Sequence, residues 1–415
     1  MHLKTGDSVV IENLNTELEK DRQHIYNTTL FVEVVVEPVI VSAFDFDINI
    51  VVKERWYIFP VPELDFIDGS FNDWLMKSDG DWTRVNYGIK FIDNNLTGRK
   101  DHIRLFLLNG YTRTINFDYR APYTNSKLTE GMSVGGGYYQ NREVAYKTSY
   151  DNSLVYYKKR DFVESQWNAQ VTYSIRKAIK TSQFFGINYT HVNIDDSLVN
   201  VKYNSDYFNR PTSKIGYVDL WYTLQYLDVD NILYPLSGKS YDVTITKRGL
   251  GFSGGINLFS IQSSINKFWP LGKKWFVSTQ FRGNIKLPFN QPYINQDAMG
   301  RGAYLRGLEE QVIDGVAWGI LKTNLKKELF NFSVPFIKRS KTFNKIPFRI
   351  YAKTFADLGY SYTKEDYTSR LNNKLLYSAG FGLDIVTFYD VQLRLEYSFN
   401  QLGQNGLFLH NDKGF

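Results

Sequence analysis

The nine residues Val391-Gln392-Leu393-Arg394-Leu395-Glu396-Tyr397-Ser398-Phe399 alternate strictly between apolar and polar side chains. Successive side chains of a β-strand point to opposite faces, so this period of two predicts a strand with one apolar and one polar face. The polar face carries Arg394 and Glu396, which are poorly suited to the interior of a soluble sandwich. The stretch therefore favours a strand whose apolar face meets lipid and whose polar face lines an aqueous lumen.

The same alternation recurs along the chain. It places Trp275, Val277, Thr279, Phe281 and Ile285 opposite Ser278, Gln280, Arg282, Asn284 and Lys286, and it places Val218, Leu220, Tyr222, Leu224 and Tyr226 opposite Asp219, Thr223 and Gln225. Sixteen strands are expected, an even number as barrel closure requires, and many reach the roughly 9–11 residues of a tilted crossing. They start near Arg84, His102, Thr112, Glu130, Tyr146, Phe162, Ser182, Ile215, Lys239, Gly255, Lys274, Val316, Pro347, Leu375, Val391 and Gly406. The predicted fold is membrane β: a 16-stranded antiparallel transmembrane β-barrel over residues 83–415.

Composition narrows the alternatives. Of the 415 residues 16% are aromatic, which suits strands and membrane interfaces, and cysteine is absent, which excludes disulfides and thiolate metal sites. No apolar run approaches the roughly 18 residues of a spanning helix. The net charge of +6 comes from scattered Lys and Arg residues, so we expect no nucleic acid as a partner. The apolar outer face of the predicted barrel implies membrane lipids as partners. A set of soluble β-sandwiches is the alternative fold, and the charges on the second face of each strand weigh against it.

The first 60 residues differ from the rest. A polar helical stretch over 14–26 precedes strand-like runs over 29–36 and 46–52, which predicts a small α+β unit. Residues 61–82 are expected to form a linker, because Pro60 and Pro62 and then Phe71-Asn72-Asp73-Trp74 interrupt the pattern. Met1-His2-Leu3-Lys4 leads straight into polar sequence, so we expect an export signal to lie upstream of this chain.

A long glycine-containing segment, residues 288–315, separates two predicted strands. It contains Gly300-Arg301-Gly302-Ala303-Tyr304-Leu305-Arg306-Gly307-Leu308. Loops of this length usually have a function of their own, although a mobile extracellular loop is an equal alternative. Phosphate cradling does not fit, because no strand-to-helix passage follows the glycines.

Within this segment, Leu305-Arg306-Gly307-Leu308 resembles the [VIL]-R-G-[FYL] loop motif of the BamA/TamA family of outer-membrane assembly and translocation barrels. The resemblance implies that the loop folds into the lumen and that its arginine contacts the Asp of an F-x-D-x-G motif, here Phe355-Ala356-Asp357-Leu358-Gly359. Strand parity independently turns Arg349, Lys353 and Asp357 toward the lumen. On the intervening strand the family often has Glu where this chain has Asn324, so Glu328 is an alternative partner of Arg306.

Further matches extend the resemblance along the chain. Residues 227–238 are similar to the family's D-x-x-D-N-x-x-x-P-x-x-G turn, and residues 95–99 to its N-x-x-G-R turn. Residues 1–60 resemble the second half of a polypeptide-transport-associated (POTRA) domain, through Gly6-Asp7, residues 22–31 and residues 51–55. This implies a periplasmic partial POTRA unit on a barrel of the outer membrane. Absence of the first strand and helix would leave an exposed sheet edge.

Catalytic motifs are absent from the sequence. The five His residues show no i,i+4 pairing, no H-E-x-x-H and no G-x-S-x-G partner. His191 near Asp195 and Asp196 is the single pairing of note, and a solvated loop cluster explains it better than an active site. We therefore predict no enzyme, no metal and no cofactor.

The resemblance implies a function in assembling and inserting outer-membrane proteins or in translocating polypeptide. Its clients would be unfolded outer-membrane proteins or secreted polypeptides, with accessory subunits as further partners. We expect a lateral seam between the first strand, with Arg84, Val85, Tyr87 and Ile89, and the last, with Leu407, Phe408 and Leu409. An incoming strand would add there by β-augmentation. The alternatives are a passive pore and a structural or accessory barrel subunit of an outer-membrane complex.

Overall fold

A computed structural model describes residues 3–42, 44–67, 75, 79–250, 256–300, 302–336, 345–364, 369–387 and 390–412. The predicted linker motif at residues 71–74 and the terminal Phe415 lie outside these ranges. Within them, no helix has the length and hydrophobicity that crossing a bilayer requires.

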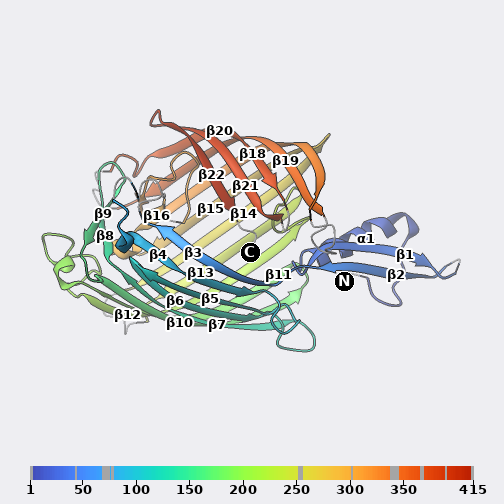
Figure 1. Ribbon diagram of the computed structural model, residues 1–415, viewed down its shortest axis with the longest axis horizontal. Helices are drawn as coiled ribbons and strands as arrows, with labels where there is room; N and C mark the ends of the chain where they lie inside the picture. Colours follow the sequence, from blue (N-terminus) through green and yellow to red (C-terminus); the bar gives the residue numbers. More distant parts are fainter. Residues whose placement is uncertain are drawn as a thin grey trace.

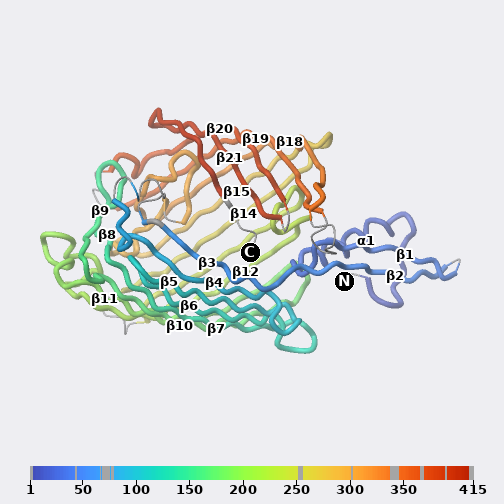
Figure 2. Tube along the Cα trace, in the orientation of Figure 1, coloured from blue at the N-terminus to red at the C-terminus, as the bar shows by residue number. Residues whose placement is uncertain are grey.

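A single antiparallel sheet of sixteen strands dominates the structure, as the alternation predicted. Figures 1 and 2 show it rolled into a barrel, with its first strand (blue) and last strand (red) on the side that faces the viewer. The strands from the first to the eighth are β3 (Ile58–Phe66), β4 (Val85–Asp93), β5 (His102–Gly110), β6 (Thr112–Ala121), β7 (Glu130–Asn141), β10 (Glu164–Ala178), β11 (Thr181–Ile194) and β12 (Lys214–Val229). The remaining eight are β13 (Gly238–Arg248), β14 (Leu258–Gly272), β15 (Trp275–Leu287), β18 (Ala317–Pro335), β19 (Lys345–Tyr362), β20 (Leu375–Val386), β21 (Gln392–Asn400) and β22 (Asn405–Asp412).

The predicted count is right, but the set of strands is not. The first strand is β3, which spans the predicted boundary between the N-terminal unit (1–60) and the linker (61–82). The strand expected near Tyr146 belongs to a separate hairpin, β8 (Glu143–Thr148) with β9 (Leu154–Lys158). Pro60 and Pro62 suggested a linker because proline cannot donate to a ladder. An edge strand tolerates proline, however, since one of its edges needs no donors. The barrel therefore begins at Ile58, earlier than the predicted boundary at residue 83.

The two faces of the wall differ as the sequence predicted. On β21, Leu393 and Phe399 are exposed on the outside, whereas Gln392, Glu396 and Ser398 are almost completely buried. The barrel thus carries apolar side chains outward and keeps its charges inside, which is the distribution of a transmembrane barrel.

A small unit stands beyond one end of the barrel, as Figure 1 shows. It consists of α1 (Ile11–Tyr26) and a two-stranded sheet of β1 (Phe31–Ile40) and β2 (Phe46–Glu54). We call the barrel end that carries this unit the proximal end and the opposite end the distal end.

Loops close over the distal end and supply much of the buried apolar core. Leu198 and Phe208, between β11 and β12, pack with Val144 of β8 and Tyr157 of β9. Asn152, at the tip of the β8–β9 hairpin, is fully buried and donates to the carbonyl of Val312 in the long segment after β15 (3.0 Å). Three loops are thereby joined above the lumen, because Asn152 also accepts a hydrogen bond from the backbone N–H of Leu371 (3.1 Å).

Candidate functional site: a charged cluster inside the barrel

The long segment between β15 and β18 folds into the lumen around Leu305 and Leu308, each of which is buried. A short ladder between β16 (Asp297–Met299) and β17 (Ile313–Asp314) closes it on itself. Leu305 and Leu308 pack with Met299, Ile313, Trp318, Leu371 and Leu376 in one apolar cluster. The segment is therefore an ordered structure with its own core, and Arg306 projects from it.

Arg306 meets three carboxylate and amide partners on three different strands. Its Nε donates to Oδ2 of Asp357 on β19 (2.9 Å), its Nη2 donates to Oδ1 of the same carboxylate, and its backbone N–H donates to Oδ2 (3.1 Å). Its Nη1 donates to Asn324 of β18 and to Oε1 of Glu396 on β21 (3.3 Å). A bidentate contact between a buried arginine and a buried carboxylate fixes the position and the orientation of the guanidinium group.

One aromatic residue and two glycines complete the surroundings of the motif. The Arg306 guanidinium lies 3.9 Å from the centroid of the Phe355 ring, which is a cation–π contact. Gly359 leaves room for Leu305, since a Cβ at Gly359 would lie 2.6 Å from Cδ1 of Leu305. Gly307 has a φ of +82°, which favours glycine. The two segments therefore fit each other through Arg306 with Phe355 and Asp357, and through Leu305 with Gly359.

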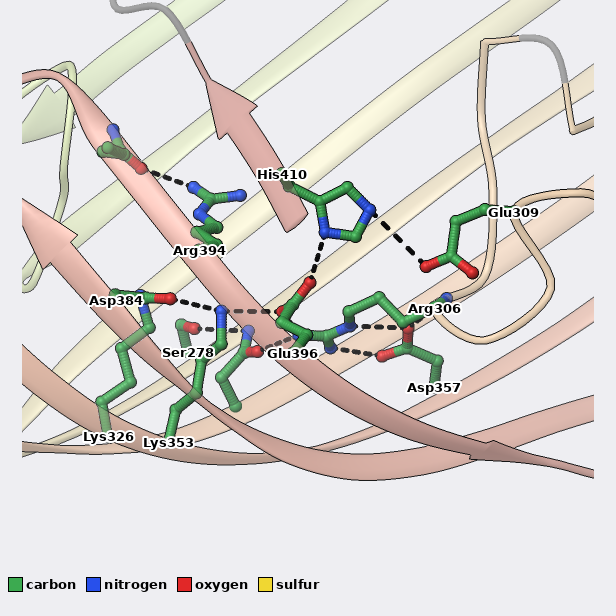
Figure 3. Close-up of polar contacts among 12 residues, drawn as sticks. Ser278, Arg306, Glu309, Lys326, Lys353, Asp357, Asp384, Arg394, Glu396 and His410 are labelled. Atoms are coloured by element: carbon green, nitrogen blue, oxygen red, sulfur yellow. Dashed lines mark hydrogen bonds and ion pairs between the residues drawn. The ribbon is translucent and has the colours of Figure 1, made fainter. Parts of the chain in front are cut away.

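The charges continue down the lumen as alternating ion pairs, which Figure 3 shows in part. Lys353 contacts Glu396 (2.7 Å) and Asp384 of β20, and Lys326 of β18 contacts Asp384 (3.0 Å). We call Arg306, Asp357, Glu396, Lys353, Asp384 and Lys326 the loop cluster. Its carboxylates and cations neutralise one another, which buried ions require.

A turn from the proximal end reaches the same cluster from the other side. The β12–β13 turn is shaped by Asp230, whose Oδ1 accepts from the backbone N–H groups of Leu236 (3.0 Å) and Ser237 (3.1 Å). It carries the buried Tyr234 into the lumen, where the hydroxyl donates to Asp384 (2.9 Å) and accepts from Lys326 (3.0 Å). The predicted turn motif therefore positions a side chain of the lumen, in addition to reversing the chain.

His410 connects the loop cluster to the last strand. It lies on β22, its Nδ1 is 2.8 Å from Oε2 of Glu396, and its Nε2 is 3.6 Å from Oε1 of Glu309 in the inward loop. Its ring also stacks on that of Tyr304, with centroids 5.6 Å apart. Figure 3 shows His410 between the two carboxylates. His410 thus ties the edge strand β22 to the inward loop, in addition to the backbone ladder that joins β22 to β21.

Several predicted positions differ from this arrangement. Glu328 does not contact Arg306 among the described residues; it pairs with Lys274 (2.9 Å) instead, and Asn324 takes the place beside the arginine. Arg84, Val85, Tyr87 and Ile89 do not lie at the seam, because β4 is paired on one side with β3 and on the other with β5. Leu407, Phe408 and Leu409 do lie on the edge strand β22.

The sequence reasoning missed Glu396, Lys353, Asp384 and His410 as members of the site. Their inward parity was readable, but parity does not tell which inward residues of strands distant in the chain share one height in the barrel. A cavity of about 450 Å³ remains beside the cluster, lined among others by Tyr304, Lys322 and Arg394. The described residues contain no group of His, Cys, Asp and Glu side chains that could hold a metal ion.

The amino-acid sequence matches none of the protein-family models and none of the curated proteins with which it was compared. The structure, in contrast, is similar to that of BamA from Haemophilus ducreyi lacking POTRA domains 1–3, with a TM-score of 0.53 and 16% identity over 98% of this chain and 81% of that chain. It is also similar to CdiB from Escherichia coli, with a TM-score of 0.55 and 13% identity over 98% of this chain and 69% of that chain. The chain therefore has the fold of these barrels, as the loop motif implied.

Proposed function

We propose that this barrel handles unfolded polypeptide at the outer membrane, either by inserting outer-membrane proteins or by translocating polypeptide across it. The fold shared with BamA and CdiB supports the proposal, and the seam between β3 and β22 carries it. In the orientation that this function requires, the distal end of the barrel faces the cell exterior. The N-terminal unit, as a partial POTRA unit, then lies in the periplasm. The activity would need no catalytic residue, because strand pairing and burial drive it.

The seam is built from two strands that pair poorly. The ladders of the described residues run from β22 through to β3, and they include none that joins β3 to β22. Pro60 and Pro62 lie on β3, and prolines in an edge strand leave its free edge without N–H donors at their positions. β22 presents Leu407 and Leu409 outward, both well exposed. An incoming strand with a full set of donors and acceptors would pair with β22 better than β3 does.

The loop cluster supports the same proposal from inside. The inward loop is fixed to β18, β19 and β21 through Arg306, and to β22 through His410. β22 therefore has a fixed inner face and an unpaired edge. Such a strand can stay in place while its edge exchanges partners.

A cysteine lock at the seam tests the proposal, and the chain has no native cysteine to interfere. Leu64→Cys on β3 and Leu407→Cys on β22 would be joined by a series of bismaleimides of increasing length, because both side chains are outward and exposed. We expect the lock to stop assembly of clients, measured by proteomics of the outer membrane in a strain that depends on the locked protein.

The matched control is Leu64→Cys with Tyr87→Cys, which are register partners in the internal β3–β4 ladder. This lock leaves the seam free and should leave client assembly unchanged. Normal assembly with the seam locked would refute insertion through the seam. In that case a large single-channel conductance would favour the passive pore, and a closed barrel would favour an accessory subunit.

A further inference from the structure

A second cavity, of about 580 Å³, lies at the proximal end between α1 and the inner wall of β6, β10, β11 and β12. Lys20, Gln23 and His24 of α1 line one side, and Phe184, Gln225 and Val229 are among the residues on the other. The cavity also contains Lys100, Arg120 and Arg176, and we call these three cations and the space around them the basic pocket. The carboxylate that lines it, Asp228, is taken up by Lys180 (2.8 Å). The cavity therefore lies at the barrel end that carries the N-terminal unit.

The three cations of the basic pocket lack carboxylate partners. Arg176 donates to the hydroxyl of Tyr123 (3.0 Å) and to the carbonyl of Ile179 (2.9 Å), which are neutral groups. Arg120 lies 5.5 Å from the centroid of the Phe184 ring. Neither these two nor Lys100 forms an ion pair within the part of the chain that the structure describes. Arg120 is exposed to the cavity, and Lys100 and Arg176 are half-buried. Their like charges repel one another across the cavity, and this repulsion is relieved when an anion binds between them.

The wall next to the pocket adds further positive charge. Arg104 of β5 faces inward one strand away from Arg120, and its Nε is buried without a hydrogen-bond partner. Asp118 pairs with Arg104 in the strand register, and it attracts Arg120 from beyond ion-pair distance. One acid therefore serves two arginines, and neither of them is neutralised by a direct contact.

Lys100 is held in the pocket by the turn that precedes β5. Its backbone has a φ of +64°, a conformation that non-glycine residues rarely adopt, and its N–H donates to Oδ1 of Asn95 (2.8 Å). Burial, with Arg176 and Arg120 nearby, lowers the pKa of Lys100 to about 8. The N-x-x-G-R turn thus keeps an amine beside two guanidinium groups, an arrangement that repels itself until a negative charge arrives.

We infer that the basic pocket binds an acidic peptide segment through its carboxylates. The cavity is bordered by both α1 and the inner wall, and it combines its cations with apolar side chains, Pro122, Ile175, Ile179 and Phe184. Mixed apolar and cationic walls suit a peptide better than a bare inorganic anion, which would need only the charges. The binding does not depend on the proposed assembly activity, because the purified barrel alone would show it.

The test measures binding of a fluorescent peptide that alternates Glu and Leu to the purified full chain in nanodiscs of uncharged lipid. Peptides with Gln or Lys in place of Glu are the ligand controls. We expect saturable binding of the Glu peptide alone, weakened by added salt. Arg120→Gln and Lys100→Gln should each weaken it about tenfold, the effect of losing one charge-assisted hydrogen bond.

Lys127→Gln is the matched protein control, because Lys127 is an exposed cation in the β6–β7 turn at the same barrel end and does not line the cavity. It should bind the Glu peptide as the unaltered chain does. Circular dichroism and heat-dependent gel migration would establish that each variant keeps its barrel. Arg120→Lys serves as a second variant, which should retain most of the binding if charge is what the peptide needs.

Three results would overturn the inference. The first is failure of the Glu peptide to bind. The second is equal weakening by Lys127→Gln, which would show a non-specific charge effect. Displacement of the peptide by millimolar inorganic phosphate would identify a small-anion site instead. Because none of these readouts involves client assembly, a failure here would leave the seam proposal untouched, and a failed seam lock would leave this one untouched.

Discussion

The loop cluster and the basic pocket both place cations inside one barrel, and they treat those cations in opposite ways. Arg306, Lys353 and Lys326 each contact a carboxylate, whereas Lys100, Arg120 and Arg176 have no ion pair among the described residues. Paired buried charges favour one arrangement of the chain. Unpaired cations remain available to bind an anionic ligand. The difference assigns a positioning role to the first set and a binding role to the second.

The largest expected effect is that of Arg306→Ala. It removes the partner of the fully buried Asp357, and breaking a buried pair by losing one member costs about 3–5 kcal/mol. We expect this loss in the free energy of unfolding, measured by urea titration in detergent. Arg306→Lys keeps the charge but loses the bidentate contact, so its stability should lie between that of the unaltered chain and that of Arg306→Ala. Unchanged stability in both variants would mean that the loop cluster does not position the loop.

Gly359→Ala comes next and probes the same seat without changing a charge. The added Cβ would meet Cδ1 of the buried Leu305, and overpacking of this kind costs about 1–3 kcal/mol. The loss should appear in the same urea titration. Gly302→Ala is the control, since a Cβ there meets no atom within 4 Å. Equal effects of the two substitutions would show that the seat of Leu305 is not the cause.

Asp390→Asn sharpens the comparison, because Asp390 lies at the proximal end yet is fully paired. Its carboxylate accepts from the hydroxyl of Tyr26 (2.7 Å), from Arg349 (2.9 Å) and from Asn231 (3.2 Å), and so joins the N-terminal unit to the barrel. Its φ of +55° is one that Asn also adopts. Because Asp390 and the basic pocket lie at the same end of the barrel, a difference between their variants would reflect the pairing of the charges and not their location. We expect Asp390→Asn to loosen the unit, seen as faster proteolysis between residues 54 and 58.

The pH dependence of this contact follows from Tyr26. Burial and the neighbouring Asp390 carboxylate raise the pKa of Tyr26 to about 12. The contribution of the neutral phenol to docking is therefore complete below its ordinary pKa near 10 and is lost as the pH rises toward 12. NMR of ring-labelled tyrosine, with Tyr26→Phe for assignment, would follow the titration. In Asp390→Asn the pKa should move down toward 10, and an unmoved pKa would contradict the role of Asp390.

The smallest expected effect is that of Arg120→Gln on stability. Removing a cation that other cations repel should change the free energy of unfolding by less than about 0.5 kcal/mol. A loss as large as that of Arg306→Ala would erase the distinction between the two sets of charges.

Much of the fold was predictable from local pattern. The outward and inward sets of β21 follow from alternation alone, and the pairing of Arg306 with Asp357 was implied by two short motifs. The position of the seam was not predictable in the same way. Pro60 and Pro62 argue against a central strand, which needs backbone N–H donors along both edges. Only the order of strands in the sheet shows that β3 is an edge strand and needs these donors on one edge alone.

The sequence by itself determined which side chains face lipid and which face the lumen, because a strand alternates residue by residue and neighbours along the chain carry that information. Only the tertiary structure decided which inward charges meet. Glu396, Asp384 and His410 come to one height in the barrel through the stagger of strands far from Arg306 in the chain. The same geometry brings Lys100, Arg120 and Arg176 together, while the acid of their cavity, Asp228, pairs with Lys180 instead. Whether a lumenal cation is paired is thus a property of the register between strands, which no single strand encodes.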